Sequence, residues 1–290
     1  MAEATSATTA SSSTRSSRPC LGISHPVFRI GSSLPPDYQT CYCFQVALIA
    51  AADQCAPIEP FSSKYGPLTL EQAAAIRQAW LYLKMAAGHR PRGKKIGAVE
   101  RRWRSHAQAL EPGWGHILDS TLLVDGTALP ASHLIQPRVE AEFAFLLARD
   151  LAGPGVTAAH ALASTAGVCA AFEVIDSRFR PKAPTKEDAT ADNAFHAYAV
   201  VGAQLVAPLD LDLAAFAVRL EINGEAKGTG SGANILGNPV HALVALANVV
   251  PLHGGEIILT GSVAGAFPIG PGDQVRAEFD RLGAITLKVE

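Results

Sequence analysis

Hydrophobic and polar positions alternate in two different ways along the chain, and the first pattern is helical. Between residues 42 and 88, Thr69 and Gln72 match a capping box, and apolar residues then recur at helical spacing until Gly88, a natural helix end. A further helix is predicted over about 42–53. This part of the sequence therefore predicts a small helical region.

After residue 93 the pattern changes to short apolar runs separated by Gly and Pro, which predicts strands. The predicted strands are 94–98, 138–148, 169–178, 197–206, 215–222, 255–260, 274–279 and 284–289. Two helices interrupt them, one over about 158–165 with Thr157 as N-cap and one over 239–249 with Asn238 as N-cap. Many strands with few, irregularly placed helices predict an α+β fold with an antiparallel or mixed sheet.

The first 36 residues differ from the rest in composition. Ser, Thr and Ala dominate, arginines supply the charge, and Glu3 is the only acid. Such a stretch buries too little apolar surface to offset its ordering entropy, so a disordered tail is expected; a mitochondrial-type targeting segment is the alternative. The predicted domains are thus a tail at 1–36, a helical region at 37–92 and a strand-rich domain at 93–290.

Bulk composition narrows the class of protein. Apolar residues make up 48% of the 290 residues and the net charge is −2, which supports a sizeable core and disfavours a protein that coats nucleic acid or an anionic membrane. No apolar run is long enough for a membrane span. The five cysteines, four of them near the start, favour reduced thiols in a cytoplasmic compartment; a zinc site is the less usual alternative.

Two acidic residues stand at the start of a strongly apolar strand. On a strand, Glu140 and Glu142 point to the same face, about 6.6 Å apart, and unbroken apolar sequence follows them. Two buried carboxylates this close repel each other unless a cation lies between them. The alternative is an edge strand with two solvated glutamates.

A third acid lies in similar surroundings. Glu173 stands in the apolar run of the next predicted strand, and Asp176 points to the other face of that strand. Three carboxylates form an all-oxygen set, which suits Mg²⁺ or Mn²⁺ and is poorly suited to zinc. About three of six octahedral positions would stay open for a small-molecule 2-oxo acid and water, an arrangement that polarises a carbonyl group.

Charge balance requires a positively charged side chain near the substrate. A dication with three carboxylates has a net charge of −1 and would repel an anionic substrate. Lys95, which enters an apolar strand, is the candidate to bind the substrate carboxylate or to act as a base. A nucleic-acid patch over residues 89–104 is disfavoured, because Trp103 is its only aromatic residue.

These residues occur in a set of motifs whose order resembles the 2-keto-4-pentenoate hydratase branch of the fumarylacetoacetate hydrolase-like superfamily. The resemblance runs from about Lys64 to the C-terminus. Its motifs are Lys95-Ile-Gly, Trp114-Gly, Gln136-Pro-Arg-Val-Glu-Ala-Glu, Glu173-Val-Ile-Asp-Ser-Arg, Ala191-Asp-Asn, Gly230-Ser-Gly to Leu236-Gly-Asn-Pro, and Gly255-Glu-Ile-Ile-Leu-Thr-Gly-Ser.

The resemblance implies a mixed β-roll or sandwich that holds the metal, preceded by a small helical region. It implies that Glu140, Glu142 and Glu173 bind Mg²⁺ or Mn²⁺ and that Lys95 lies beside the substrate carboxylate. The implied enzyme is a hydro-lyase of aromatic catabolism that converts a 2-hydroxy-2,4-dienoate into a 4-hydroxy-2-oxo acid. A homo-oligomer is also implied, and a pathway decarboxylase is a possible partner.

Alternatives share the same metal chemistry. A 4-oxalocrotonate-type decarboxylase or an acylpyruvate C–C hydrolase needs the same electron sink at the 2-oxo group, and a non-catalytic relative would keep the fold alone. The hydrolase also needs a His–carboxylate pair to activate water, and the sequence offers no clear pair.

The sequence departs from many relatives at two positions. Gly113 stands where relatives have an acid, and Phe195 where they often carry a small hydroxyl residue. The neighbouring His196 is therefore a candidate catalytic acid or base, and Glu111 is another. Thr260 is a candidate substrate contact. Asp192 and Asn193 suit either a turn or a ligand contact.

Overall fold

The computed structural model describes residues 36–97, 113–181, 184–209 and 211–290, with side chains described from residue 41 onward. The chain divides after Pro35, and Pro36–Glu290 forms one compact unit. Apart from residue 36, the predicted tail lies outside the described residues. None of the described helices has the length and hydropathy needed to span a membrane.

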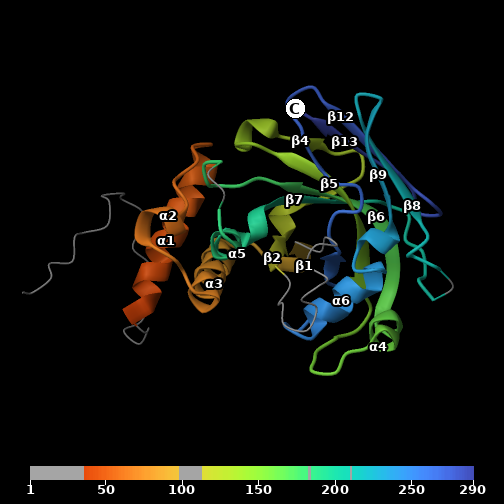
Figure 1. Cartoon of the computed structure of the whole chain (residues 1–290), viewed down its shortest axis with the longest axis horizontal. Coiled ribbons are helices and arrows are strands. Elements are labelled where there is room, and N and C mark those ends of the chain that lie inside the picture. Colours follow the sequence, from red (N-terminus) through yellow and green to blue (C-terminus); the bar gives the residue numbers. More distant parts are fainter. Residues whose placement is uncertain (1–35, 98–112, 182–183, 210) are drawn as a thin grey trace, which may run out of the picture. The chain divides into compact units, whose positions relative to one another are not determined.

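Three helices gather on one side of this unit (Figure 1). They are α1 (Pro36–Asp53), α2 (Phe61–Tyr65) and α3 (Leu70–Ala86). Both hydrogen bonds of the predicted capping box between Thr69 and Gln72 are present and start α3. The predicted helical region is therefore confirmed, although its first helix begins earlier than expected.

The larger sheet has eight strands in the order β2-β1-β10-β5-β6-β7-β3, with β11 paired to β5 outside this path. Its strands are β1 (Pro91–Gly97), β2 (Gly113–Leu118), β3 (Leu122–Val124), β5 (Arg138–Leu147), β6 (Thr165–Ile175), β7 (His196–Val201), β10 (Ile257–Leu259) and β11 (Ala266–Pro268). β1 runs parallel to β10 and β3 parallel to β7, whereas β5 and β6 are antiparallel. The sheet is mixed, as predicted.

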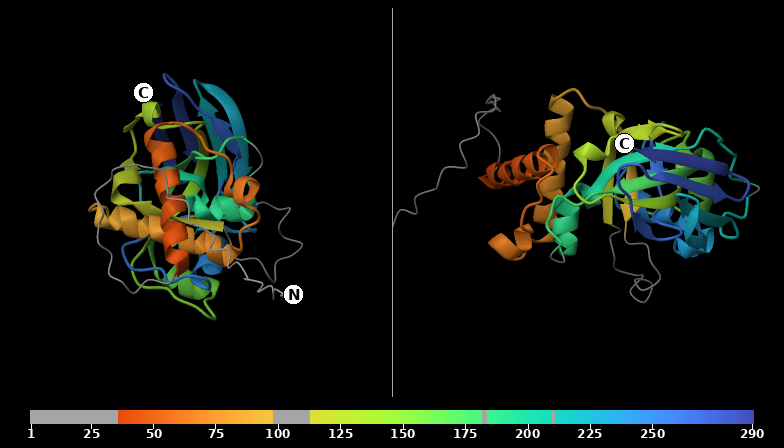
Figure 2. Two further views of the ribbon diagram at one scale, coloured as in Figure 1. Left: turned by 90° about the vertical axis from the view of Figure 1, so that its left-hand side faces the viewer. Right: turned by 90° about the horizontal axis from the view of Figure 1, so that it is seen from above.

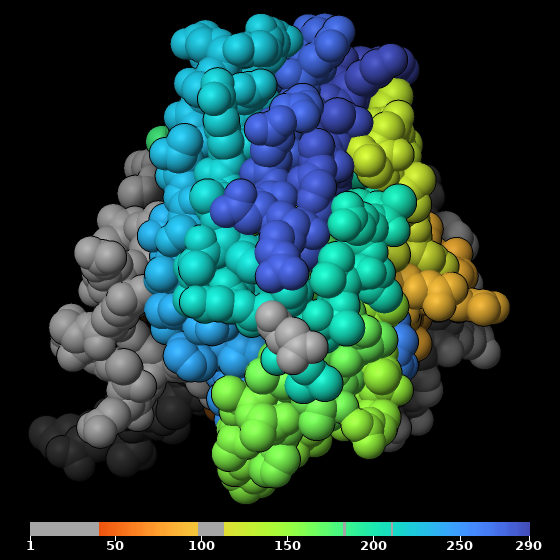
Figure 3. All heavy atoms as spheres, turned by 90° about the vertical axis from the view of Figure 1, so that its right-hand side faces the viewer, coloured from red at the N-terminus to blue at the C-terminus, as the bar shows by residue number. Residues whose placement is uncertain are grey.

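The second sheet has five strands in the order β4-β13-β12-β8-β9. Its strands are β4 (Ala128–Leu129), β8 (Ala217–Ile222), β9 (Glu225–Ser231), β12 (Gln274–Phe279) and β13 (Gly283–Val289). Figure 3 views the molecule from the side on which these cyan and blue strands lie next to each other. Along β12 every second residue is buried, so one face packs inward and the other is exposed to solvent.

Three more α-helices complete the unit: α4 (Ala158–Ala163), α5 (Lys186–Ala191) and α6 (Pro239–Ala247). Thr157 and Asn238 cap α4 and α6 as predicted, and Pro239 occupies the first turn of α6. In the right-hand view of Figure 2 the orange helices α1 to α3 lie to one side of the strands.

The two faces of the larger sheet have different surroundings. One face, here called the outer face, packs against the second sheet. On this face Phe143 contacts Phe279 of the second sheet edge-on, with ring centroids 5.5 Å apart. The inner face carries a separate apolar cluster that includes Ala144, Ala171 and Leu259. Edge strand β2 contacts β7 although four strands separate them, so the sheet rolls around this inner face without closing into a barrel. The predicted α+β roll is confirmed.

Candidate metal and substrate site

Three glutamates meet on the inner face because β5 and β6 pair in antiparallel register. Glu140 lies directly opposite Glu173, and Glu142 follows two residues along on the same face. One carboxylate oxygen from each lies within 4.8 Å of the others. Glu142 and Glu173 are fully buried and Glu140 is half-buried. The three carboxylates predicted from the sequence are therefore adjacent.

Each fully buried glutamate has one oxygen held by the protein. The backbone N–H of Gly261 donates to Oε2 of Glu142 at 2.7 Å, and Nδ1 of His196 lies 3.0 Å from Oε1 of Glu173. Oε1 of Glu142 has no hydrogen-bond partner among the described residues, and Oε2 of Glu173 has only an ion pair with Lys95. Buried carboxylate oxygens left in this way fit a divalent cation.

The protonation of the three glutamates agrees with such a site. Burial raises the pKa of Glu142 well above its usual range and that of Glu140 to about 7, and the charge of Glu173 adds to both shifts. Burial also opposes ionisation of Glu173, but Lys95 and His196 outweigh it and lower its pKa. A cation that displaced the protons of Glu140 and Glu142 would relieve this repulsion.

Lys95 comes to the glutamates from β1. Its Nζ lies 3.0 Å from Oε2 of Glu173, and its side chain is only 3% exposed. Gly97 follows on the same face, and a Cβ there would lie 3.7 Å from Nζ, with Gly113 on the adjacent strand facing Gly97. Because neither glycine carries a side chain, space is left beside the ammonium group.

Lys94, the residue before Lys95, points to the opposite face of β1. Lys94 forms a separate ion pair with Glu256, with Nζ to Oε1 and Oε2 distances of 2.7 and 2.8 Å. Adjacent residues of a strand point to opposite faces, so Lys94 and Lys95 serve different parts of the molecule.

The structure places His196 against Glu173, where the sequence had offered no clear His–carboxylate pair. Its Nε2 lies 3.3 Å from Oγ1 of Thr121, and burial is the largest cause that lowers its pKa. Thr260 is fully buried, and its hydroxyl donates to the carbonyl of Phe143. The roles of His196 and Thr260 in catalysis and substrate binding stay predictions.

Asp192 and Asn193 pin a turn. Arg178 donates to Oδ1 of Asp192 at 2.5 Å and to the carbonyl of His196 at 3.1 Å. Asn193 accepts from the backbone N–H of His116 and donates to its carbonyl, which ties the turn to β2. The contacts of Thr121, Arg178 and Gly261 with His196, Asp192 and Glu142 were not predicted, because these partners are distant along the chain.

Other candidates lie elsewhere. Glu111 and residues 98–104 of the basic stretch are outside the described residues. Within the described part of the chain, the group able to share an ion consists of glutamates alone, so the cysteines form no such set.

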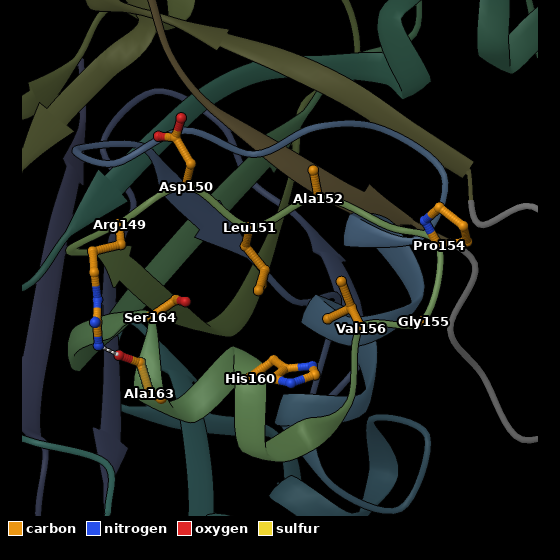
Figure 4. Close-up of a pocket in the computed structure, with 10 residues that line it drawn as sticks. All are labelled: Arg149, Asp150, Leu151, Ala152, Pro154, Gly155, Val156, His160, Ala163 and Ser164. Carbon is orange, nitrogen blue, oxygen red and sulfur yellow. Dashed lines mark hydrogen bonds between the residues drawn. The ribbon is translucent and has the colours of Figure 1, made fainter.

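A hollow of about 440 Å³ lies away from the glutamates, between α4 and the loop before it. Figure 4 shows His160, Asp150 and Arg149 around it. The Arg149 guanidinium donates to the carbonyl of Ala163 at the edge of this hollow. Its lining includes none of the residues of the glutamate site.

The rolled mixed sheet and its buried acidic cluster define a recognised class. The model of the fumarylacetoacetate hydrolase C-terminal domain matches residues 98–290, and the chain belongs to this family. Within it, the 2-hydroxyhexa-2,4-dienoate hydratase of Comamonas testosteroni is 36% identical over 248 residues, covering 83% of this chain and 94% of that protein.

Two further comparisons extend this result. The 2-hydroxypent-2,4-dienoate hydratase of Pseudomonas putida is 39% identical over 204 residues, which cover 70% of this chain and 92% of that enzyme. The 4-oxalocrotonate decarboxylase of Pseudomonas putida G7, solved with magnesium and adipate, has a TM-score of 0.83 and 25% identity, covering 90% of this chain and all of that one. The resemblance to the 2-keto-4-pentenoate hydratase branch is confirmed.

Proposed function

We propose that this chain is a metal-dependent hydratase that adds water to a 2-hydroxy-2,4-dienoate and forms a 4-hydroxy-2-oxo acid. The observation that carries the proposal is the buried cluster of Glu140, Glu142 and Glu173 with Lys95 at its edge. Two relatives that are 36% and 39% identical are named as hydratases of such dienoates, which supports this choice of reaction.

In this proposal the three glutamates hold one divalent cation, Mg²⁺ or Mn²⁺. The cation would polarise the 2-oxo group and stabilise negative charge on its oxygen. A structural neighbour solved with magnesium, together with the all-oxygen ligand set, supports a hard cation.

Lys95 balances the charge of this site. The cation and three carboxylates sum to −1, so the Lys95 ammonium brings the cluster to neutrality before an anionic substrate enters. Its Nζ is 3.0 Å from Glu173, and the lack of a side chain at Gly97 would leave room for the substrate carboxylate. The ammonium would bind this carboxylate and orient the chain of conjugated carbons behind it.

Two proton transfers complete the reaction. Ketonisation takes a proton from the 2-hydroxyl group and places one on a carbon of the diene. Water then adds across the remaining conjugated double bond, its oxygen bonding to C4 and a proton to C3. Lys95 would hold or move these protons at Nζ, which lies 3.0 Å from Oε2 of Glu173.

Decarboxylation of a 4-oxalocrotonate is the second candidate, because the decarboxylase neighbour has a TM-score of 0.83. Hydrolytic C–C cleavage is less well supported. Although His196 and Glu173 form a His–carboxylate pair, the second ring nitrogen of His196 faces Thr121 at 3.3 Å and the side chain is 1% exposed. A base that activates water needs a nitrogen that water can reach.

One experiment separates these reactions. Purified protein is mixed with Mg²⁺ and 2-hydroxypenta-2,4-dienoate, and with 4-oxalocrotonate in a second sample. A hydratase removes the dienol absorbance, gives 4-hydroxy-2-oxopentanoate, releases no CO₂ and stops when a chelator is added. Release of CO₂ from oxalocrotonate establishes the decarboxylase instead, and inertness toward both acids contradicts an enzymatic role.

A homo-oligomer in the cytoplasm belongs to the same proposal. Light scattering of the purified protein, alone and mixed with a decarboxylase of the same pathway, tests self-assembly and the partner.

A further inference from the structure

A β-bulge turns His196 toward the glutamates. Along β6 and β7, Glu173 pairs with Ala199 and Val174 with Tyr198, but the next pair joins Ile175 to His196. One residue, Ala197, is therefore inserted, and His196 faces the same side as Glu173. In a regular ladder it would point to the opposite side, with Tyr198.

The turn before His196 keeps an unfavourable backbone conformation. Asn193, Ala194 and Phe195 have φ angles of 50°, 50° and 63°, the left-handed region that bulky side chains rarely adopt. Arg178 binds both the start of this turn and the carbonyl of His196, and Asn193 ties it to β2. Strain held by so many contacts points to a function for the residue that follows.

The hydrogen bonds around His196 specify one tautomer. An ionised carboxylate only accepts hydrogen bonds, so Nδ1 of His196 carries the hydrogen that Oε1 of Glu173 accepts at 3.0 Å. In the neutral imidazole Nε2 is then an acceptor, and the Thr121 hydroxyl lies 3.3 Å from it. The Thr121 hydroxyl accepts from the backbone N–H of Leu118 at 3.1 Å, and its hydrogen lies between two acceptors, the carbonyl of Leu118 at 3.2 Å and Nε2 of His196 at 3.3 Å.

The two fully buried glutamates therefore have equivalent arrangements. For Glu142, the Gly261 N–H holds one oxygen and leaves the other without a hydrogen-bond partner among the described residues. For Glu173, His196 holds one oxygen and leaves the other directed to Lys95. Hydrogen bonds from outside the ligand set commonly fix a metal ligand in this way.

We infer that His196 and Thr121 are positioning residues, in which Thr121 holds Nε2 of His196 as a hydrogen-bond acceptor and His196 fixes the carboxylate of Glu173 for the cation. This inference rests on the proposed metal site. It gives a function to the bulge at Ala197 and to the turn before it.

The test uses Thr121→Val, which keeps the shape of the side chain and removes the hydroxyl. Thr121→Ser restores the hydroxyl, and Thr127→Val removes a hydroxyl bonded to Val124, which is not part of this chain of contacts. Titration of each metal-free protein with Mg²⁺ or Mn²⁺ alone measures binding by calorimetry. We expect Thr121→Val to weaken binding about tenfold and the other two variants to stay within about threefold of the original protein.

A second readout does not depend on the metal. Long-range ¹H–¹⁵N spectra of protein labelled at histidine should show the Nδ1–H tautomer of His196, and a shift toward Nε2–H in Thr121→Val. Equal metal affinity in Thr121→Val and the original protein overturns the inference, as does an Nε2–H tautomer in the original protein. If the original protein binds no metal, the proposed site fails, whereas the tautomer is still measured.

His196 variants provide a second test in case Thr121→Val does not fold. His196→Asn keeps an N–H donor near the position of Nδ1, and His196→Leu removes it. Weaker metal binding in His196→Leu than in His196→Asn supports the positioning role. Equal affinity of these two variants contradicts it, and equal affinity with a lost limb of the pH–rate profile assigns His196 to acid–base catalysis instead.

Discussion

The two sheets differ in how many of their faces are buried. In β12 of the five-stranded sheet, buried and exposed residues alternate without exception over Gln274–Phe279. In β6 of the larger sheet, residues 167–174 are all buried, and they include Glu173. One sheet has a solvated face that carries charges in water. The other is covered on both faces, so each charge on it must be paired or must bind a cation.

This difference separates stability from function. Apolar residues on the buried face of the five-stranded sheet stabilise the fold simply by their burial. Glu142, which is buried, and Glu140, which is half-buried, oppose folding because each loses hydration near another carboxylate, and their raised pKa values express that cost. The larger sheet thus contains groups that serve function at the expense of stability.

The substitution Glu142→Gln should separate function from stability most clearly. Loss of one ligand oxygen should reduce metal-dependent turnover on the order of a thousandfold, because the cation contributes several kcal/mol to the reaction. Since the amide carries no buried charge, the metal-free variant should unfold at the same or a higher temperature than the original protein. Turnover with saturating Mg²⁺ and thermal unfolding with a chelator measure the two effects.

Glu278→Gln is the matched control on the exposed face of β12. Glu278 is an exposed partner of Arg276, so the same substitution there should change neither quantity appreciably. Full turnover in Glu142→Gln would remove Glu142 from the ligand set.

Lys94 and Lys95 allow the same contrast within one strand. Lys95→Met should lower kcat/KM about a hundredfold through lost substrate binding, with metal affinity changed only a few fold. Lys94→Met should instead destabilise the fold by about 2–3 kcal/mol, because it removes the counter-ion of the mostly buried carboxylate of Glu256 and leaves it only the backbone N–H of His253. Steady-state kinetics and urea unfolding of both variants separate the two outcomes; equal kinetic defects would contradict the assignment of Lys95 to the substrate.

The same contrast explains what the sequence could predict. β12 was predicted at its observed bounds, 274–279, because its alternation is local. β5 and the shared face of Glu140 and Glu142 were also predictable, since a strand has a period of two. Motif order then identified the family without any knowledge of packing.

The missed elements depend on contacts that are distant in the sequence. β2 contains two glycines and a histidine, and β9 is rich in Gly and polar residues, so neither shows a clear apolar alternation. Alternation also cannot reveal the bulge at Ala197, which reverses the direction of His196. The site is therefore least predictable where the backbone is irregular.

The buried His116, on β2 of the larger sheet, should make the protein less stable at acid pH. Burial, with Arg77 and Lys94 nearby, lowers its pKa from 6.5 to about 3. Between these values the unfolded chain binds a proton that the folded protein does not, so the free energy of unfolding falls as the pH falls from 6.5 to 3. His116→Leu should therefore lose about 1–2 kcal/mol less stability than the original protein between pH 7 and pH 5.

Urea unfolding at pH 7 and pH 5 checks this difference, which is independent of the other titrating groups because they are common to both proteins. Identical pH dependence in His116→Leu and the original protein would show that His116 is protonated equally in the folded and unfolded chains.

The smallest effect is expected on the solvated face of the five-stranded sheet. Nη1 of Arg276 lies 2.6 Å from Oε1 of Glu278, but the two side chains are 44% and 55% exposed. Water screens such a pair, and ordering two long side chains offsets much of the attraction, so a double-mutant cycle with Ala should give a coupling below about 0.5 kcal/mol. A coupling as large as that of Lys94 with Glu256 would mean that burial does not decide the strength of ion pairs in this protein. The contrast between the two sheets would then need another physical origin.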